Sequence, residues 1–99
     1  MKRIEIIANQ SVQDAIASRL EQAIDGFAYT VIPVVHGITK ERRRLGNGTW
    51  PEENFLLISY IDDQLLPQVQ KLMIEIKHKF PQEGIKLFVI ESCFSIQES

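Results

Sequence analysis

The chain has 99 residues and a mass of 11.4 kDa, a length that favours one domain over two. Hydrophobic residues make up 44% of it and charged residues 24%, which excludes a disordered chain. The net charge of −2 excludes a generally basic nucleic-acid coat, and no apolar run approaches the roughly 18 residues of a membrane helix. Cys93 is the single cysteine, and the start lacks a signal-peptide pattern. We therefore expect one cytoplasmic domain over residues 1–99, without nucleic-acid binding or membrane insertion.

The first half of the chain predicts a strand, a helix and a second strand. Residues 2–8 alternate in polarity as a strand does, and Ser11 is a good N-cap for the helix that follows. Gly26 is a suitable helix stop. Residues 27–36 are β-branched and aromatic but carry Pro33, which places this strand at a sheet edge or a bulge. The helix is indicated by apolar residues at a spacing of four: Val12, Ile16, Leu20 and Ile24.

The second half predicts a strand, a helix and a last strand. Residues 54–61 are almost continuously apolar, as in a central strand, and residues 85–91 form the final strand. Between them a helix runs from about 63 to 79, with Pro67 in its first turn. The order βαββαβ predicts an α+β, ferredoxin-like fold, with an antiparallel four-stranded sheet of order 4-1-3-2 and two helices on one face. Pro33 then falls on an edge strand.

Both faces of this sheet are apolar in the sequence. One alternate set of the third strand contains Phe55 and Leu57, and the other contains Leu56, Ile58 and Tyr60. Two helices can cover only one face, so the other face is left as exposed apolar surface. Exposed patches above roughly 600 Å² are rare on monomers. The sequence therefore predicts self-association through the uncovered face.

The connection over residues 37–53 is too long for a hairpin and concentrates positive charge. Lys40 and the run Arg42, Arg43 and Arg44 stand there with Glu41 as the only acidic residue before position 51. Arginine offers a bidentate fork to phosphates and carboxylates, so this loop is a candidate anion reader. Trp50 is either an anchor for a partner protein or a residue that packs the loop onto the body.

Three stretches of the sequence resemble the PII-like signalling family, in particular a group of short PII-like proteins. YTVIPVVHG (29–37) resembles the second strand entering the family's T-loop, and RLGNGTWPEENF (44–55) resembles the return of that loop. EGIKLFVIE (83–91) is similar to the family's B-loop and last strand. The resemblance implies a homotrimer that binds an effector, commonly an adenine nucleotide such as ATP, ADP or AMP, in clefts between subunits. It also implies that the loop engages a transporter, an enzyme or a regulator.

The resemblance also assigns positions. Gly37 matches the glycine that opens the T-loop, and Gly84 and Lys86 approximate the B-loop glycine and its phosphate-binding lysine. With the arginines they make the expected effector site: Gly37, Arg42, Arg43, Arg44, Gly84 and Lys86. The expected partner-binding residues are Lys40, Arg43 and Trp50. We expect a flexible T-loop-like segment over residues 37–53, no metal and no catalysis.

Two alternatives share this architecture. A dimeric α+β barrel enzyme would need a base such as His36 or Tyr60. A trimeric metal-binding protein of the CutA kind would need His36, Cys93 and loop carboxylates to converge across subunits. The spacing of the histidines, the cysteine and the carboxylates does not require a metal site. The sequence also contains no nucleophile pattern that requires an enzyme.

Overall fold

The computed structural model describes residues 1–38, 52–91, 94 and 96, and it contains four strands, two α-helices and two short 3₁₀ turns. In chain order the elements are β1 (Lys2–Asn9), η1 (Gln10–Val12), α1 (Gln13–Ala23), β2 (Thr30–Gly37), β3 (Glu52–Ile61), η2 (Asp63–Leu65), α3 (Leu66–Lys79) and β4 (Ile85–Ile90). Neither described helix is long and apolar enough to cross a membrane.

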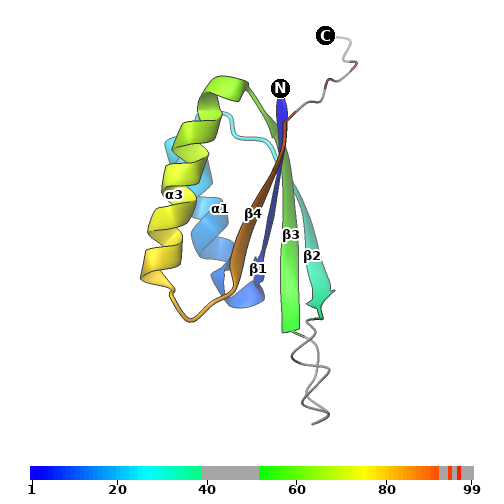
Figure 1. The fold of residues 1–99 in the computed structure, drawn as a ribbon, viewed down its shortest axis with the longest axis vertical. Helices are drawn as coiled ribbons and strands as arrows, with labels where there is room; N and C mark the ends of the chain where they lie inside the picture. The colour runs from blue at the N-terminus through cyan, green and yellow to red at the C-terminus, as the bar shows by residue number, and fades with distance from the viewer. Residues whose placement is uncertain (39–51, 92–93, 95, 97–99) are drawn as a thin grey trace.

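The four strands form one antiparallel sheet in the order β2-β3-β1-β4, which confirms the predicted ferredoxin-like topology. Both helices lie on one side of this sheet (Figure 1). The central strand β1 pairs with β3 and β4, so that Ile6 lies opposite Leu57 on one side and Leu87 on the other. As predicted, β2 is an edge strand.

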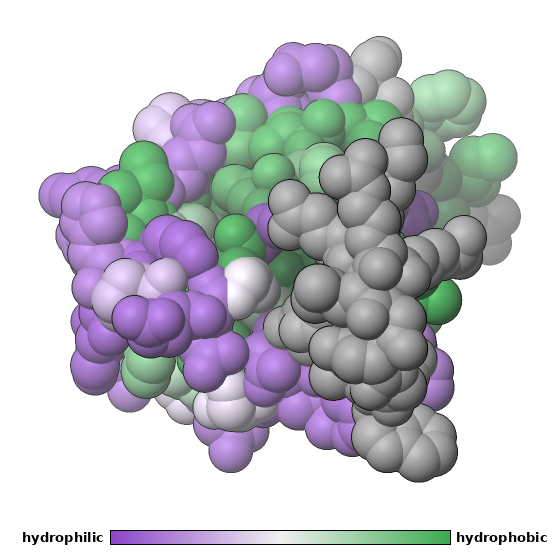
Figure 2. Space-filling model, turned by 60° about the horizontal axis from the view of Figure 1, so that its bottom comes forward, coloured by the Kyte–Doolittle hydropathy of each residue, from purple (hydrophilic) through white to green (hydrophobic). Residues whose placement is uncertain are grey.

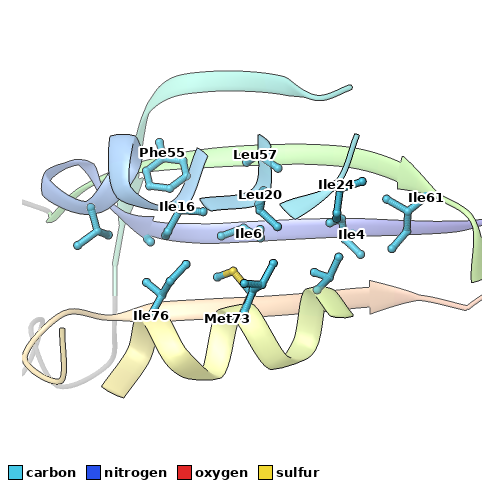
Figure 3. Packing of buried hydrophobic residues seen from close by; sticks show 14 residues of the cluster. Ile4, Ile6, Ile16, Leu20, Ile24, Phe55, Leu57, Ile61, Met73 and Ile76 are labelled. Carbon is cyan, nitrogen blue, oxygen red and sulfur yellow. The ribbon is translucent and has the colours of Figure 1, made fainter. Parts of the chain in front are cut away.

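The core lies between the helices and one face of the sheet (Figure 3). Every second residue of the central strands points into it, because strand side chains alternate between faces. Ile4, Ile6, Phe55 and Leu57 are fully buried there. The helices contribute their apolar stripes, among them Ile16, Leu20, Val69, Met73 and Ile76.

The start of the first helix differs from the prediction. Ser11 is not its N-cap: a 3₁₀ turn comes first, and the side chain of Asn9 accepts a hydrogen bond from the Ser11 N–H at 2.9 Å. Asn9 therefore satisfies the N–H that opens this turn, two residues earlier than expected. Gly26 has a φ of +70°, a left-handed conformation that suits its predicted role after the helix. Pro67 lies in the first turn of α3, as predicted.

Strand β2 begins at Thr30, three residues later than predicted. Phe27 and Tyr29 precede it and stack on each other with ring centroids 5.4 Å apart, packed against the core. The pairing of β2 with β3 shifts by one residue between Ile32 and Val35, so Pro33 sits at a bulge of an edge strand. The Gln10 amide donates to the Pro33 carbonyl at 2.6 Å, which ties this bulge to the turn after β1.

Candidate functional site

The face of the sheet opposite the helices is exposed and largely apolar; we call it the open face. Tyr60 is 55% exposed, Phe88 48% and Ile32 42%, all large hydrophobic side chains. Register places them with Leu56, Ile58 and Ile7 on the same side of the sheet. In Figure 2, hydrophobic surface gathers in one area beside the helices, whose own surface is mostly hydrophilic. The uncovered apolar surface expected from the sequence is therefore present.

A polar cluster crosses one end of this open face. Arg3 pairs with Glu5 at 2.8 Å, and both side chains are half-buried. The Arg3 guanidinium also donates to the Tyr60 hydroxyl at 3.0 Å and lies 5.8 Å from the centre of that ring. The hydrogen bond to Glu5 raises the pKa of Arg3, so the charged form is the one that this cluster holds. Composition and apolar patterning did not reveal this cluster, although the alternation of Arg3, Glu5 and Ile7 contains it.

The other end of the open face contains a hollow of about 330 Å³, which we call the loop-base hollow. It lies where the long connection leaves β2 and returns to β3, and it also reaches the turn before β4. His36, Gly37 and Ile38 line it from the end of β2, and Gly84 and Lys86 line it from the start of β4. Three segments that are distant in sequence therefore meet in one concave site.

Strand register explains how these residues meet. Ile7 on the central strand lies opposite Leu56 of β3 and opposite Lys86 of β4, so these three side chains form one row across the open face. Val35 lies opposite Asn54 beyond the bulge. Because neighbouring strands are about 4.8 Å apart, the row spans roughly 10 Å, and its cationic end is Lys86. The floor of the hollow is thus apolar, with charge at its rim.

Asn54 is the unusual residue of this hollow. The residue is only 7% exposed, and its Oδ1 atom is a buried acceptor that has no hydrogen-bond partner among the residues that the structure describes. Leaving such a group unpaired costs about 1–3 kcal/mol. Asn54 was not among the predicted site residues, although an asparagine that opens the apolar run NFLLISYI was a detectable signal. A ligand that donates a hydrogen bond at this point would remove the penalty.

The structure brings together only part of the expected effector site. Gly37, Gly84 and Lys86 line the loop-base hollow together. The expected residues Lys40, Arg42, Arg43, Arg44 and Trp50 lie outside the described residues.

The bases considered for the alternative functions do not share a site. His36 lines the hollow and lies opposite Glu53 of β3. Tyr60, which binds Arg3, lies seven residues further along β3. His36 and Tyr60 are therefore roughly 23 Å apart along the strand direction. Cys93 lies outside the described residues. In the described part of the chain, no three His, Cys, Asp or Glu side chains come together as metal ligands do.

The hollow combines a cation, a buried amide acceptor and glycine backbone near its mouth. Lys86 provides a point charge for an anion, and the glycines allow close approach to backbone N–H groups. Fold and hollow together define a small ferredoxin-like protein with an anion-compatible site at the base of a long loop.

Comparison with solved structures gives the same fold. The chain is similar to CPII, a nitrogen regulatory PII-like protein from Thiomonas intermedia K12 bound to ADP, AMP and bicarbonate, with a TM-score of 0.63 and 17% identity over 90% of this chain and 82% of that one. A PII-like signalling protein from Thermus thermophilus gives the same values, and the apo form of CPII gives a TM-score of 0.56. No family model and no curated protein matches. The fold is that of PII-like proteins, as the sequence resemblance implied.

Proposed function

We propose that this chain is a non-enzymatic, PII-like regulator that binds a small anionic effector, an adenine nucleotide, in the loop-base hollow. The observation that carries this proposal is the meeting of Gly37, Gly84 and Lys86 in one concave site with Asn54, whose buried Oδ1 has no partner in the described part of the chain. An adenine nucleotide has phosphates for Lys86 and an amine that can donate a hydrogen bond to Asn54. The similar protein CPII binds ADP, AMP and bicarbonate, which supports testing these ligands first.

We further propose that the protein is a homotrimer held together by its open faces. Burying about 500 Å² of such surface is worth roughly 12 kcal/mol before the costs of association. The loop-base hollow opens on the same face, since Ile7, Leu56 and Phe88 belong to both. A neighbouring copy would therefore supply a wall of the hollow, which places the effector between subunits.

The loop then becomes the output of the site. Its two ends, Gly37 and Glu52, are paired in register at the hollow, so a bound anion acts where the loop begins and ends. Arg42, Arg43 and Arg44 are the cations that an effector would draw toward Lys86. Ordering of a segment by a phosphate is a known kind of switch. In one of its conformations, Lys40, Arg43 and Trp50 would contact a transporter, an enzyme or a regulator.

Titration calorimetry tests the effector proposal. We expect wild-type protein to bind at least one of ATP, ADP and AMP, alone or with bicarbonate. Lys86→Ala should weaken this binding by about tenfold or more, because a charge-assisted bond to phosphate is lost. Lys71→Ala is the matched control, since Lys71 is an exposed lysine of α3 away from the hollow. No heat with any of these ligands would refute the effector proposal.

The oligomer is tested separately by light scattering. We expect a species of three chains at micromolar concentration. A lone 11.4 kDa species would refute the trimer.

A further inference from the structure

A second hollow, the edge groove, lies between α3 and the first half of β4 and has a volume of about 480 Å³. Its apolar walls are Met73 and Ile74 on the helix and Ile85 and Leu87 on the strand. Ile74 is 57% exposed there, although it is a large apolar residue. Strand β4 ends the sheet on this side, so its outer backbone groups are open to a further strand. The edge groove therefore fits an extended, apolar segment.

The same chain contains a segment with the matching pattern. Phe94 and Ile96 are 88% and 90% exposed, the highest values among the large hydrophobic residues that the structure describes. They are two positions apart, so in an extended chain their side chains project from one side about 6.6 Å apart. Ile85 and Leu87 have the same spacing on the groove side of β4. An added strand could therefore place both pairs in contact.

In its own chain, the residue that precedes this segment, Glu91, is held at the end of β4 that is far from the groove. Lys2 Nζ holds the Glu91 carboxylate at 2.9 Å and its carbonyl oxygen at 3.4 Å. This contact continues the pairing of β1 with β4, in which Arg3 lies opposite Ile90. Glu91 directly follows the end of β4, whereas the edge groove lies at the start of this strand.

A tight reversal after Glu91 is also unfavourable. A two-residue hairpin turn prefers Asn-Gly or Asp-Gly, because those residues adopt a positive φ readily. The sequence at this point is Glu-Ser, which has neither property. The natural occupant of the edge groove is consequently the segment of another molecule of the same chain.

We propose that the stretch of one copy that carries Phe94 and Ile96 adds as a strand to the edge of β4 in a second copy, with both side chains in the edge groove. The backbone supplies the affinity of this kind of strand addition, and the two apolar side chains supply its register. Phe94 and Ile96 would contact the helix side of β4, where Ile85 and Leu87 lie, whereas Lys86 and Phe88 of the loop-base hollow lie on the opposite face. The strand addition therefore adds a second junction between copies.

Cross-linking between differently labelled copies tests this directly. Each protein carries Cys93→Ser to remove the native thiol; one carries Ile74→Cys and the other Ile96→Cys. Mixed and treated with a short bismaleimide, they should give a covalent heterodimer on a denaturing gel. The matched control replaces Ile74→Cys with Ser18→Cys, an exposed position on α1, and should show loss of that product.

Two further variants make the outcome decisive. Phe94→Ser in the Ile96→Cys protein should abolish the product without changing its circular dichroism, because Phe94 is exposed and holds no part of the core. A protein with both cysteines reports on the alternative. If it cross-links within one chain while the mixture gives nothing, the segment occupies its own groove and the proposal is wrong. Equal product from the Ser18→Cys control, or no product in any sample, also overturns it.

Discussion

The two faces of the sheet are about equally apolar in sequence but differ in whether their buried polar groups have hydrogen-bond partners. On the covered face, the polar exception Ser59 is 2% exposed and donates its hydroxyl to the Ala28 carbonyl at 2.6 Å. On the open face, Asn54 keeps a buried oxygen that has no partner within the described ranges, and Arg3 is held by Glu5. Among the described residues, Ser59 of the covered face has its partner, whereas the open face keeps one buried acceptor without a partner and a paired charge cluster.

This difference separates stability from binding. Satisfied polar groups and closely packed apolar side chains stabilise one chain by itself. An unpartnered acceptor and exposed aromatic rings lower the stability of the isolated chain and are useful when a ligand or another copy covers them. The covered face therefore accounts for the fold, and the open face is where a function is to be sought.

The largest effect should come from the covered face. Phe55→Ala removes a fully buried ring and should lower the free energy of unfolding by about 3–5 kcal/mol. Phe88→Ala on the open face is the matched control; its ring is 48% exposed, so we expect a loss below about 1 kcal/mol in the isolated chain. Urea unfolding at a concentration where chains are separate measures both. Equal losses would show that the two faces contribute equally to the stability of the isolated chain.

A smaller effect of opposite sign is expected in the loop-base hollow. Asn54→Leu replaces an amide whose buried Oδ1 has no partner among the described residues by an apolar side chain of similar size, and it should stabilise the isolated chain by about 1–3 kcal/mol. Thermal unfolding without ligand measures this gain. The same variant should bind adenine nucleotides more weakly, because the acceptor is gone. A loss of stability would mean that Asn54 is a structural residue.

Asn54→Asp provides the control for chemistry at that position. It keeps the shape and the acceptor oxygen but adds charge next to a proposed anion site. Weaker nucleotide binding than in the wild type, with the fold retained, would agree with an anion in the hollow. Unchanged binding in both variants would place the ligand elsewhere.

Local patterns were sufficient for the fold. Helical spacing in α3, alternation in β1 and the apolar run of β3 each identify one element, and the element order leaves few topologies. Pro33 independently placed β2 at an edge. The N-cap at Ser11 was wrong because two nearby residues, Asn9 and Ser11, can both cap, and only the geometry of the turn after β1 decides between them.

The site was less predictable because it depends on register. Gly37, Gly84 and Lys86 were identified from family-like motifs, but nothing local in the sequence shows that Ile7 and Leu56 complete their surroundings. The same holds for Arg3 and Tyr60, which are 57 positions apart and meet only through the pairing of β1 with β3. The alternation pattern predicts only on which face of the sheet a residue lies. Which polar residues become neighbours on that face depends on the long-range pairing of the strands.

The polar cluster of the open face offers a further test of the comparison. Arg3→Met together with Glu5→Leu removes both charges and should keep the fold, since neither residue belongs to the core. It makes the open face continuously apolar, so association should tighten and lose specificity. Light scattering over a dilution series should show assemblies larger than those of the wild type. Arg3→Met alone is the control, because it leaves Glu5 without its partner and should weaken association instead.

The smallest effect concerns the border of the covered face, where Tyr29 donates its hydroxyl hydrogen bond to Glu21. This bond favours the neutral phenol and raises the pKa of Tyr29 above its ordinary value near 10. Because the folded pKa is the higher one, the associated stability is present below pH 10 and is lost as the pH rises through the folded value. Glu21→Gln should lower the pKa of Tyr29 toward its ordinary value, and the accompanying change in stability should be smaller than those expected at Phe55 and Asn54.

Tyr60→Phe leaves Tyr29 as the single tyrosine, so an ultraviolet titration in that background reads it alone. Glu21→Gln should then ionise at lower pH than its parent, and Arg19→Gln, on the same helix, should leave the titration nearly unchanged because Arg19 pairs with Glu75 instead. Coincident titration curves for Glu21→Gln and its parent would mean that the bond at this border does not persist in solution. The covered face would then be closed by apolar packing alone, and its stability would not depend on alkaline pH.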